Sequence, residues 1–464
     1  MAFSGKDEQF RGFALTEKPL RVVLTACLPL ALYQALQQIF RILDALMASH
    51  IGADAVSAVS CLSQITLMIT ALGTGLAVGG SIQISESYGR GDEAKVRRQT
   101  ANVYTLAIAV SVLVAGSLIP FAEPFLRLLK TPEDLIAAGA GYFRVEVLSL
   151  VVSFFNTVYI AIERSRGHAK KILALNMAII LVKLGLSALF VYILNGGLIL
   201  VAAATLFSQL LVLIYAVCTM PKDEGAFRFS ARNVCLTRDM LMPLGDLSVP
   251  VAAEKMLFAS GKVIVNSMSG VYGALTVGAL GISNHIGGLT TSWHGGFTDG
   301  ASALISQNRG AGKYRRTLRL YAWLLIVDVL IGLVGMILVS WALPWLAGIF
   351  ARSKSQLDPA FRDMIVSIHR WEMLGYITLG IHSATMALLM GYGKTKQTML
   401  INVSRVFVFR VPVLWVLQRF TGLGPEATGI TMMVSNICTG AAALSTALPL
   451  VLEIRKKALE EEKA

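Results

Sequence analysis

Long apolar stretches recur along the whole chain and are separated by short polar segments. Each stretch is about 20 residues or more, enough for a helix to cross the hydrocarbon core of a bilayer. The apolar positions are continuous rather than alternating, which favours helices over a membrane β-barrel. We therefore predict an all-α integral membrane protein with about 12 transmembrane helices. The predicted spans are 20–48, 54–85, 100–121, 138–162, 171–194, 196–218, 243–270, 274–306, 317–346, 365–391, 397–418 and 426–451.

The charged residues are few and unevenly placed. They make up 15% of the chain and give a net charge of +13. Most of the lysines and arginines fall in alternate connections, beginning with Arg90, Lys95, Arg97 and Arg98 and ending with Arg455, Lys456 and Lys457. This positive-inside pattern predicts a plasma (cytoplasmic) membrane protein with both termini in the cytoplasm. The excess positive charge is thus a signal of topology. We expect the protein to contact membrane lipids rather than nucleic acid, and we expect it to be a monomer.

Motifs of other protein classes are missing from the sequence. The five cysteines are scattered without a CxxC pair, so we expect neither a disulfide framework nor a metal site. The first 18 residues are polar and do not resemble a cleavable signal peptide. We find no HExxH, GxSxG or P-loop motif, so we expect neither an enzyme nor an ATP-driven pump. No cofactor is predicted apart from a coupling ion.

The two halves of the chain are copies of one another. The segment "QISESYGRG" at 83–91 matches "LISQNRGAG" at 304–312 with an offset of 221, which also relates Gly75 and Gly79 to Gly296 and Gly300. Later the offset becomes 226, where Arg144 and Glu146 match Arg370 and Glu372. We predict an N-terminal lobe at 1–220, a cytoplasmic linker at 221–240 and a C-terminal lobe at 241–464. Each copy holds about six spans, and parallel repeats of this kind are typical of transporters that alternate access by rocking.

Four segments resemble the multidrug and toxic compound extrusion (MATE) family of the MOP flippase superfamily. They are "QQIFRILDALMASHIGADAVSAVS" (37–60), "LISQNRGAGKYRR" (304–316), "ERSRGHAKK" (163–171) and "MGYGKTKQ" (390–397). The resemblance covers nearly the whole chain in the family's order. It implies two six-helix lobes forming a V, and export of drug-like compounds, cationic ones included, by proton or sodium antiport.

Asp44 is the predicted ion-coupling residue. It lies deep in the first span and matches the family's first-helix acid, where a proton or Na⁺ would bind; no other metal site is predicted. Its counterpart in the second copy is Val265. The alternative is that Arg41, three residues earlier, only neutralises Asp44.

The fifth span carries polar residues on one face that could point at Asp44, namely Asn176, Lys183 and Ser187. A lysine at this place favours proton over sodium coupling. The alternative is a lysine that extends to the membrane surface.

Further ionisable residues fall inside the predicted spans, where each is a functional hypothesis because burying charge in a bilayer is costly. His285, Ser292 and Asp299 recur every seven residues on the eighth span, as a proton relay or as a packing network. Arg144 with Glu146, and Arg370 with Glu372, are expected to tie their helices to neighbouring ones. The residues assigned to the substrate cavity or second lobe are Arg41, Gln37, Glu254, Lys255, Lys262, His285, Asp299 and Arg405; Asp328 and Arg410 are also intramembrane.

Deep basic groups outnumber deep acidic groups, which bears on the substrate. A cavity for hydrophobic cations should be acidic and aromatic. We therefore predict an exporter driven by proton or sodium antiport, and keep two alternatives. One is export of an anionic or zwitterionic metabolite. The other is a flippase for a lipid-linked precursor from the same superfamily.

Overall fold

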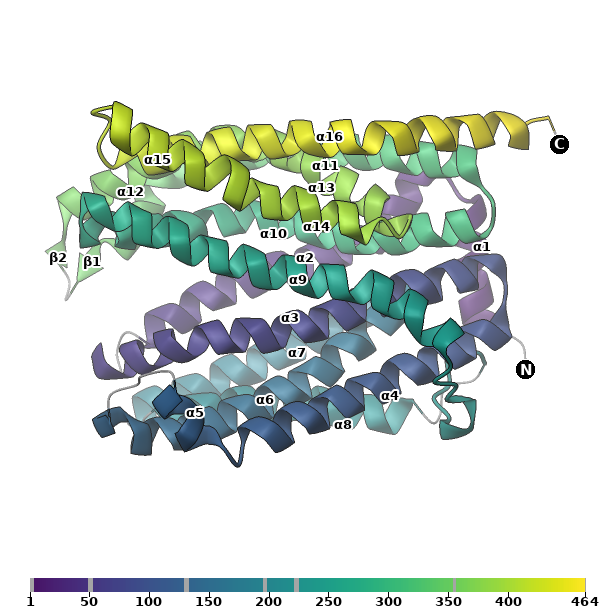
Figure 1. Ribbon diagram of the computed structural model, residues 1–464, viewed down its shortest axis with the longest axis horizontal. Helices are drawn as coiled ribbons and strands as arrows, with labels where there is room; N and C mark the ends of the chain where they lie inside the picture. Colours follow the sequence, from purple (N-terminus) through teal and green to yellow (C-terminus); the bar gives the residue numbers. More distant parts are fainter. Residues whose placement is uncertain are drawn as a thin grey trace. The chain divides into compact units, whose positions relative to one another are not determined.

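The computed structural model describes residues 4–48, 53–128, 133–194, 198–220, 225–353 and 356–463, and they are almost entirely helical (Figure 1). The predicted all-α membrane class is confirmed. The long helices of the first copy are α2 (Pro19–Ala48), α3 (Ala53–Arg90), α4 (Glu93–Leu118), α6 (Glu133–Ser165), α7 (Ala169–Ala188) and α8 (Leu198–Thr219). Those of the second copy are α9 (Arg238–Ser269), α10 (Ala274–Gly310), α11 (Tyr314–Phe350), α13 (Tyr376–Gly391) and α16 (Glu426–Glu461), with the shorter α12 (Pro359–Glu372), α14 (Thr395–Ser404) and α15 (Val411–Phe420).

Short elements complete the chain. An amphipathic helix α1 (Gly5–Thr16) precedes the first span, and α5 (Ala122–Leu128) precedes α6. Two-residue strands, β1 (Arg352–Ser353) and β2 (Gln356–Leu357), pair antiparallel. The 3₁₀ turns are η2 (Ala231–Asn233), η3 (Gly270–Tyr272) and η4 (Met373–Gly375), and the π-helical segments are η1 (Leu189–Ile193) and η5 (Arg405–Arg410).

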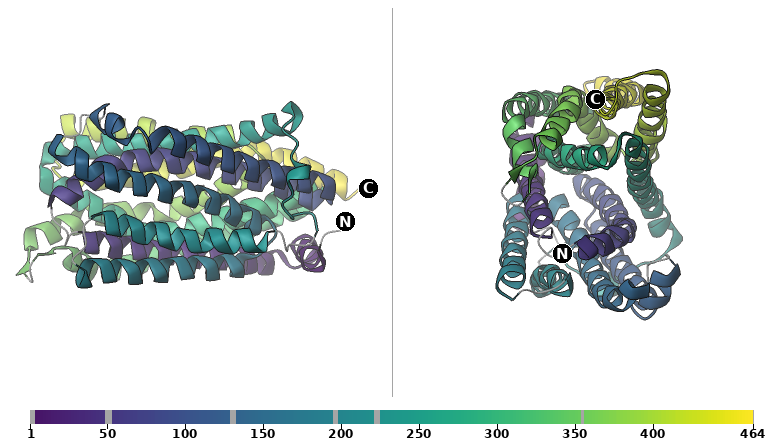
Figure 2. Two further views of the ribbon diagram at one scale, coloured as in Figure 1. Left: turned by 90° about the horizontal axis from the view of Figure 1, so that it is seen from below. Right: turned by 90° about the vertical axis from the view of Figure 1, so that its left-hand side faces the viewer.

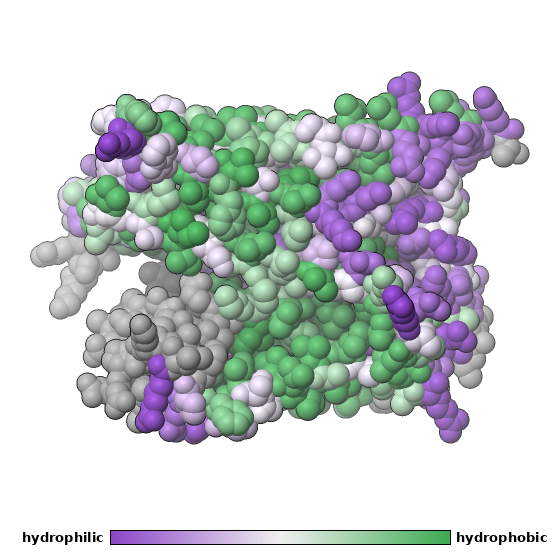
Figure 3. All heavy atoms as spheres, in the orientation of Figure 1, coloured by the Kyte–Doolittle hydropathy of each residue, from purple (hydrophilic) through white to green (hydrophobic). Residues whose placement is uncertain are grey.

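Each of the twelve predicted spans coincides with a helical stretch, but not all are single helices. The predicted span 365–391 is divided into α12, η4 and α13, and 397–418 is divided into α14, η5 and α15. In the part of the chain that the structure describes, ten stretches are long and apolar enough to cross a membrane, and α9 and α10 are not among them. Figure 3 shows hydrophobic side chains over the middle of the helices and hydrophilic ones where α16 carries the C-terminus.

The repeat is visible in the backbone of the turns. The amide of Asp92 donates to the carbonyl of Ser87 at 3.0 Å, and at the matching place Lys313 donates to Asn308 at 2.9 Å. Between them Gly91 and Gly312 have φ of +82° and +70°, where glycine avoids the steric cost of a side chain. Both glycines lie just after the end of a helix, α3 in the first copy and α10 in the second. The turns around Gly167 and Gly393 repeat the same pair of hydrogen bonds, 226 residues apart.

The helices form two compact units, which we describe separately. Unit 1 contains Met1–Ala14 and Ile39–Met256, and unit 2 contains Leu15–Gln38 and Leu257–Ala464. The long helices of each unit run alongside one another (Figure 2). The unit borders lie inside α2 and α9, at nearly equivalent positions of the two copies. The first span of each copy therefore contributes its first half to the unit built mainly from the other copy.

Four matched glycines explain this exchange. A Cβ on Gly75 of α3 would lie 2.6 Å from the carbonyl oxygen of Ser248 on α9, and one on Gly79 would overlap the same serine. In unit 2, Gly296 of α10 contacts Ala31 of α2, and a Cβ on Gly300 would lie 2.8 Å from the sulfur of Cys27. All of these positions are related by the offset of 221. The absence of side chains thus lets α9 approach α3, and α2 approach α10, at backbone distance.

Helix α1 and the segment before α9 complete unit 1. Asp7 of α1 is fully buried and accepts a hydrogen bond from Arg166, Nε to Oδ1, at 3.1 Å; Arg166 also pairs with Glu163 at 3.1 Å. Part of the predicted linker packs here as well, because Phe227 lies beside Tyr88 and beneath Arg166. Arg166 is therefore a buried structural residue.

The close approach of α2 to α10 makes a testable prediction. We expect Gly296→Ala to lower the free energy of unfolding by about 1–3 kcal/mol, because the added methyl group meets backbone rather than a movable side chain. Gly281→Ala, in the same helix with no atom within 4 Å of its Cβ position, is the matched control and should be neutral or slightly stabilising. Thermal unfolding of the purified protein in detergent measures both. Equal melting temperatures for the two variants would contradict the packing described here.

Candidate transport site

A buried hydrogen-bonded network in unit 2 is centred on Glu372. Ser283 of α10 donates to Oε2 of Glu372 at 2.6 Å, and its oxygen lies 2.8 Å from Nδ1 of His369. Because the hydroxyl proton is directed at Glu372, Nδ1 of His369 must donate to Ser283. The other ring nitrogen lies 2.9 Å from the hydroxyl of Tyr376. Glu372 therefore ties α12 to α10, in agreement with the structural role predicted for it.

Three cations surround a single aromatic ring next to this network. Lys262 of α9 lies 5.2 Å from the centroid of Phe258, and the guanidinium carbons of Arg405 and Arg410 each lie 5.7 Å from it. Arg410 is 4% exposed and lies close enough to Glu372 for their charges to interact. Arg405 donates to Asn436 at 2.8 Å, and Arg410 donates to Ser435 at 3.2 Å. We call Phe258, Lys262, Arg405 and Arg410 the Phe258 cluster.

The π-helical segment η5 brings the two arginines together. In an α-helix, residues five apart lie about 140° from one another around the axis. The amide of Val411 instead bonds to the carbonyl of Val406, five residues back. In such a turn, residues five apart come close to the same face, and π-bulges are frequent at functional sites. Arg405 and Arg410 thereby both reach Phe258.

The extra residue in η5 also changes the alignment of the two copies. It shifts the offset from 226 to 227, so that Arg410 becomes equivalent to Lys183 of α7. Lys183 lies within electrostatic reach of Glu146, which is the counterpart of Glu372. In each copy, therefore, a glutamate near the start of the fourth span lies close to a cation of the fifth span. The tie predicted for Arg144 is present too, since it pairs with Glu123 of α5 at 3.2 Å.

A second buried pair in unit 2 joins His294 of α10 to Asp328 of α11. Nδ1 of His294 lies 2.9 Å from Oδ1 of Asp328, and the two side chains are 5% and 0% exposed. Among the described residues, Nε2 of His294 has no hydrogen-bond partner. Ser383 of α13, close to Asp328, donates to the carbonyl of His294 at 3.0 Å. Cys27 of α2 lies near Asp328 and also near Asp299.

The predicted polar stripe of α10 faces the first half of α2. Gln38 donates to the carbonyl of His285 at 3.0 Å, and Gln34 donates to Asp299 at 3.1 Å. Ser292 of the same stripe is buried. His285 and Asp299 thus both contact α2.

The predicted ion-coupling residues lie in unit 1. Asp44 belongs to α2, but its side chain lies outside the described residues, so the structure does not place the proton or Na⁺ site expected there. Asn176 is buried, and its amide donates to the carbonyl of Ile172 at 2.9 Å, within its own helix. Ser187 is also buried, and Lys183 is half-buried. A common site of these three with Asp44 remains a prediction.

The remaining predicted residues lie near the places where α2 and α9 change unit. Glu254 is 1% exposed, and its Oε1 lies 3.4 Å from Nζ of the half-exposed Lys255. Gln37 is half-buried and Arg41 is exposed. Arg41 is the counterpart of Lys262, so both copies carry a cation a few residues after the unit border.

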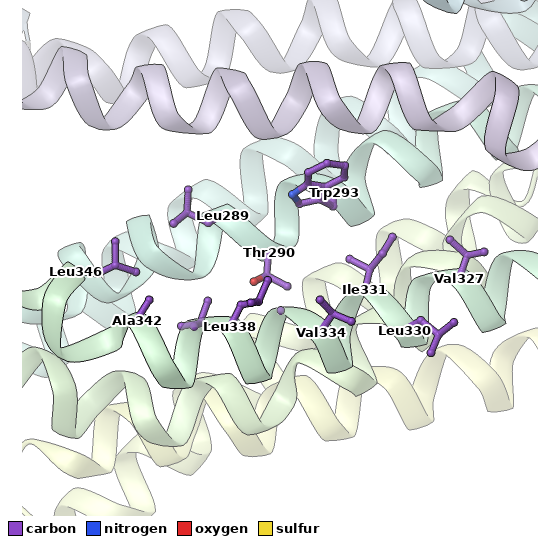
Figure 4. Close-up of a pocket in the computed structure, with 12 residues that line it drawn as sticks. Leu289, Thr290, Trp293, Val327, Leu330, Ile331, Val334, Leu338, Ala342 and Leu346 are labelled. Atoms are coloured by element: carbon purple, nitrogen blue, oxygen red, sulfur yellow. The ribbon is translucent and has the colours of Figure 1, made fainter.

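An apolar groove lies between α10 and α11 (Figure 4). Its volume is about 560 Å³, and its walls include Trp293, Thr290 and Leu338. Leu330, Val334 and Leu338 are half or more exposed along its α11 side, so the groove opens on the surface that a membrane would cover. Its lining has no charged residue and does not include the Phe258 cluster.

Comparison with known proteins identifies the family. The model of the MatE family matches residues 29–189 and 250–416, once in each copy of the repeat. The chain belongs to the MatE family. Its members are membrane transporters rather than enzymes, so a small-molecule substrate is implied.

Individual relatives agree with this membership. The chain is 25% identical over 415 residues to the probable multidrug resistance protein YoeA of Bacillus subtilis (strain 168), covering 85% of this chain and 86% of YoeA. The fold is similar to that of an outward-facing multidrug resistance MATE transporter (TM-score 0.91, 17% identity, 98% of this chain and 100% of the other). It is also similar to a MOP superfamily transporter from Pyrococcus furiosus Vc1, described as having a binding pocket of reverse polarity that suggests a different function (TM-score 0.90, 18% identity, 98% and 99% covered).

Several residues of this MatE protein's buried networks were not singled out from the sequence. His294 and His369 were overlooked, although an ionisable residue inside a span is itself a signal. His369, Glu372 and Tyr376 are spaced three and four residues apart, which places them on one helical face. That spacing could have identified the Glu372 network.

The Glu372 network gives a second prediction. Ser283→Ala removes the donor to a buried carboxylate and leaves His369 without its acceptor, so we expect a loss of about 1–3 kcal/mol of unfolding free energy. Ser445→Ala is the control, because Ser445 is exposed on α16 and bonds only to its own helix. Thermal unfolding in detergent compares the variants. A Ser283→Ala protein as stable as the Ser445→Ala protein would show that the network contributes nothing to stability.

Proposed function

We propose that this MatE protein is a secondary exporter that moves small organic compounds out of the cytoplasm in exchange for protons. It would lie in the plasma membrane with both termini in the cytoplasm, as the distribution of basic residues favours. The parallel repeat supports alternating access by movement of the two units. The names of relatives such as the multidrug export protein MepA of Staphylococcus aureus support drug-like substrates.

The observation that carries the proton assignment is the His294–Asp328 pair. Histidine changes its charge near neutral pH, and an adjacent carboxylate is a natural partner for the proton it gains. Together the pair can hold one proton as a neutral ion pair or bind a second one. Nδ1 of His294 lies 2.9 Å from Oδ1 of Asp328, so this carboxylate oxygen already has a nitrogen partner. The His369–Glu372 pair has the same composition.

Asp44 remains the second proposed coupling group. The family resemblance assigns it this role, and its counterpart Val265 is 2% exposed in the core of unit 2. The acid at this position is therefore carried by one copy alone, whereas the His294–Asp328 pair belongs to the other. Coupling through both would let the proton act on both units.

A flippase of a lipid-linked precursor is the second candidate function. The Phe258 cluster favours it, since a pyrophosphate-like headgroup needs several cations. The sequence expectation that such flippases have additional spans argues against it.

Transport in proteoliposomes tests the proposal. A proton gradient should drive movement of a fluorescent organic dye, with cationic and anionic dyes tried in turn, and a sodium gradient should not. We expect Asp328→Asn and Asp44→Asn each to lower the initial rate by about tenfold or more, because each substitution removes a carboxylate proposed to bind the coupling proton. His382→Gln and Asp363→Asn are controls, a half-buried histidine bonded to Asn402 and an exposed acid paired with Arg362. Sodium-driven movement that survives Asp328→Asn would refute proton coupling through this pair.

A further inference from the structure

His369 of α12 is a fully buried imidazole whose hydrogen bonds fix the direction of a chain of hydroxyl groups. Its polar partners in the described part of the chain are Ser283, Glu372 and Tyr376. The neutral ring carries its proton on Nδ1, so Nε2 is an acceptor and the hydroxyl of Tyr376 must donate to it. The oxygen of Tyr376 can then accept from the hydroxyl of Thr290 on α10, which lies within hydrogen-bond reach. The hydrogen bonds from Thr290 to Tyr376 and from Tyr376 to His369 therefore point the same way.

The second histidine of unit 2 lies beside the start of this chain. His294 and Thr290 are four residues apart on α10, so they share one helical face. Side chains in a helix lean toward its N-terminus, which directs the ring of His294 toward Thr290. Both residues are 4% exposed, and Nε2 of His294 has no hydrogen-bond partner among the described residues. A buried nitrogen without a partner thus lies on the side of the first hydroxyl group.

The two hydroxyl groups are shielded from water. Tyr376 is buried, and a Cβ on Gly335 of α11 would overlap the side chain of Thr290, so α11 covers Thr290 closely. Thr290 also lines the apolar groove between α10 and α11 (Figure 4), whose lining contains no charged residue. The bases that these hydroxyl groups connect are therefore the two histidines.

We propose that His369 is a second proton site of unit 2, which exchanges its proton with the His294–Asp328 pair through the hydroxyl groups of Thr290 and Tyr376. We call Thr290 and Tyr376 the relay pair. This inference rests on the proposed proton coupling and adds the group to which the proton moves. The histidines bind the proton, whereas the relay pair passes it on.

The transfer moves one proton and breaks only N–H and O–H bonds. It begins with His294 protonated on both nitrogens. Nε2 of His294 gives its proton to Oγ1 of Thr290, whose own proton passes to the oxygen of Tyr376. The proton of Tyr376 then passes to Nε2 of His369. His294 ends neutral and His369 ends as an imidazolium, and the reverse transfer restores the hydroxyl groups of the relay pair.

A carboxylate lies at each end of the path. Asp328 is 2.9 Å from Nδ1 of His294, and Glu372 is 3.6 Å from Nδ1 of His369. Each imidazolium therefore forms beside an acid, which offsets the cost of charge in the membrane. Arg410 also faces Glu372 and favours the state in which His369 is neutral. His369 is thus a site that can release the proton as well as accept it.

The repeat confines this path to the second copy. The equivalent positions of the first copy, found with the offsets of 221 and 226, hold residues that cannot carry a proton, namely Ile69 for Thr290, Gly73 for His294, Phe143 for His369 and Leu150 for Tyr376. Glu372 is kept, as Glu146. Packing of the scaffold is common to both copies, so polar groups found together in one copy indicate a task of unit 2 alone.

Transport in proteoliposomes under two conditions tests the relay pair. Under a proton gradient, Tyr376→Phe and Thr290→Val should each lower the initial rate of dye movement about tenfold or more, because proton transfer between the histidines is lost. Thr290→Ser keeps a hydroxyl group and should transport as the wild type does. The double variant should be no slower than either single variant, since each interrupts the same path. In counterflow, with dye on both sides and no gradient, no net proton transfer is needed, and every variant should match the wild type.

Tyr321 and Thr385 provide the matched control. Their hydroxyl groups lie 3.0 Å apart between α11 and α13, and both residues are buried in the same unit. They form a tyrosine–threonine pair of the same kind outside the proposed path. Tyr321→Phe and Thr385→Val should therefore transport as the wild type does under both conditions.

Three results would overturn the relay. One is wild-type rates for Tyr376→Phe and Thr290→Val under a proton gradient. Another is counterflow that falls by the same factor as driven transport, since the hydroxyl groups would then be structural. The third is an equal loss in Tyr321→Phe.

The same measurements separate this inference from the proposed function. A wild type that no proton gradient drives refutes the proposed function, and the relay with it. Normal driven transport by Tyr376→Phe, together with its loss in Asp328→Asn, refutes the relay alone.

Discussion

The rest of this structure depends on two backbone contacts, in each of which a glycine-bearing helix of one copy packs against the first span of the other copy. Gly75 and Gly79 admit α9, and Gly296 and Gly300 admit α2, each at a distance that a methyl group would prevent. These contacts fix the first half of each copy's first span to the unit formed mainly by the other copy. The second half then continues into its own unit. The second half of each first span, which carries Arg41 in α2 and Lys262 in α9, therefore lies in a different unit from the first half.

Buried charge in unit 2 is arranged in two ways that have different consequences. Glu372 and Asp328 are each paired with a histidine, so a pair that holds one proton is neutral as a whole, which lowers the cost of burying it in the membrane. The cations of the Phe258 cluster instead share one aromatic ring. Paired acids suit an ion that drives transport, whereas the cluster concentrates positive charge around Phe258.

The sequence was sufficient to predict the helical membrane class and the duplication. Apolar length and residue identity at a fixed offset carry that information directly, as Gly91 and Gly312 show. It was not sufficient for the exchange of half-spans, because a matched glycine indicates close packing but not which helix packs on it. The π-helical segment was also hidden, since one inserted residue at Arg405–Arg410 only shifts the offset by one. His294 and Asp328 are 34 residues apart, and no periodicity links them.

The glycine contacts also describe where such a chain could have come from. A polypeptide with one copy of the repeat would leave the surface around its two glycines uncovered, because the first half of its own first span does not pack there. That surface is covered only when a second copy supplies the first half of its first span. The second copy needs the same half-span from the first copy. Reciprocal exchange of an identical element is the definition of a domain-swapped dimer. The present chain has the packing of such a dimer with its two subunits joined into one polypeptide.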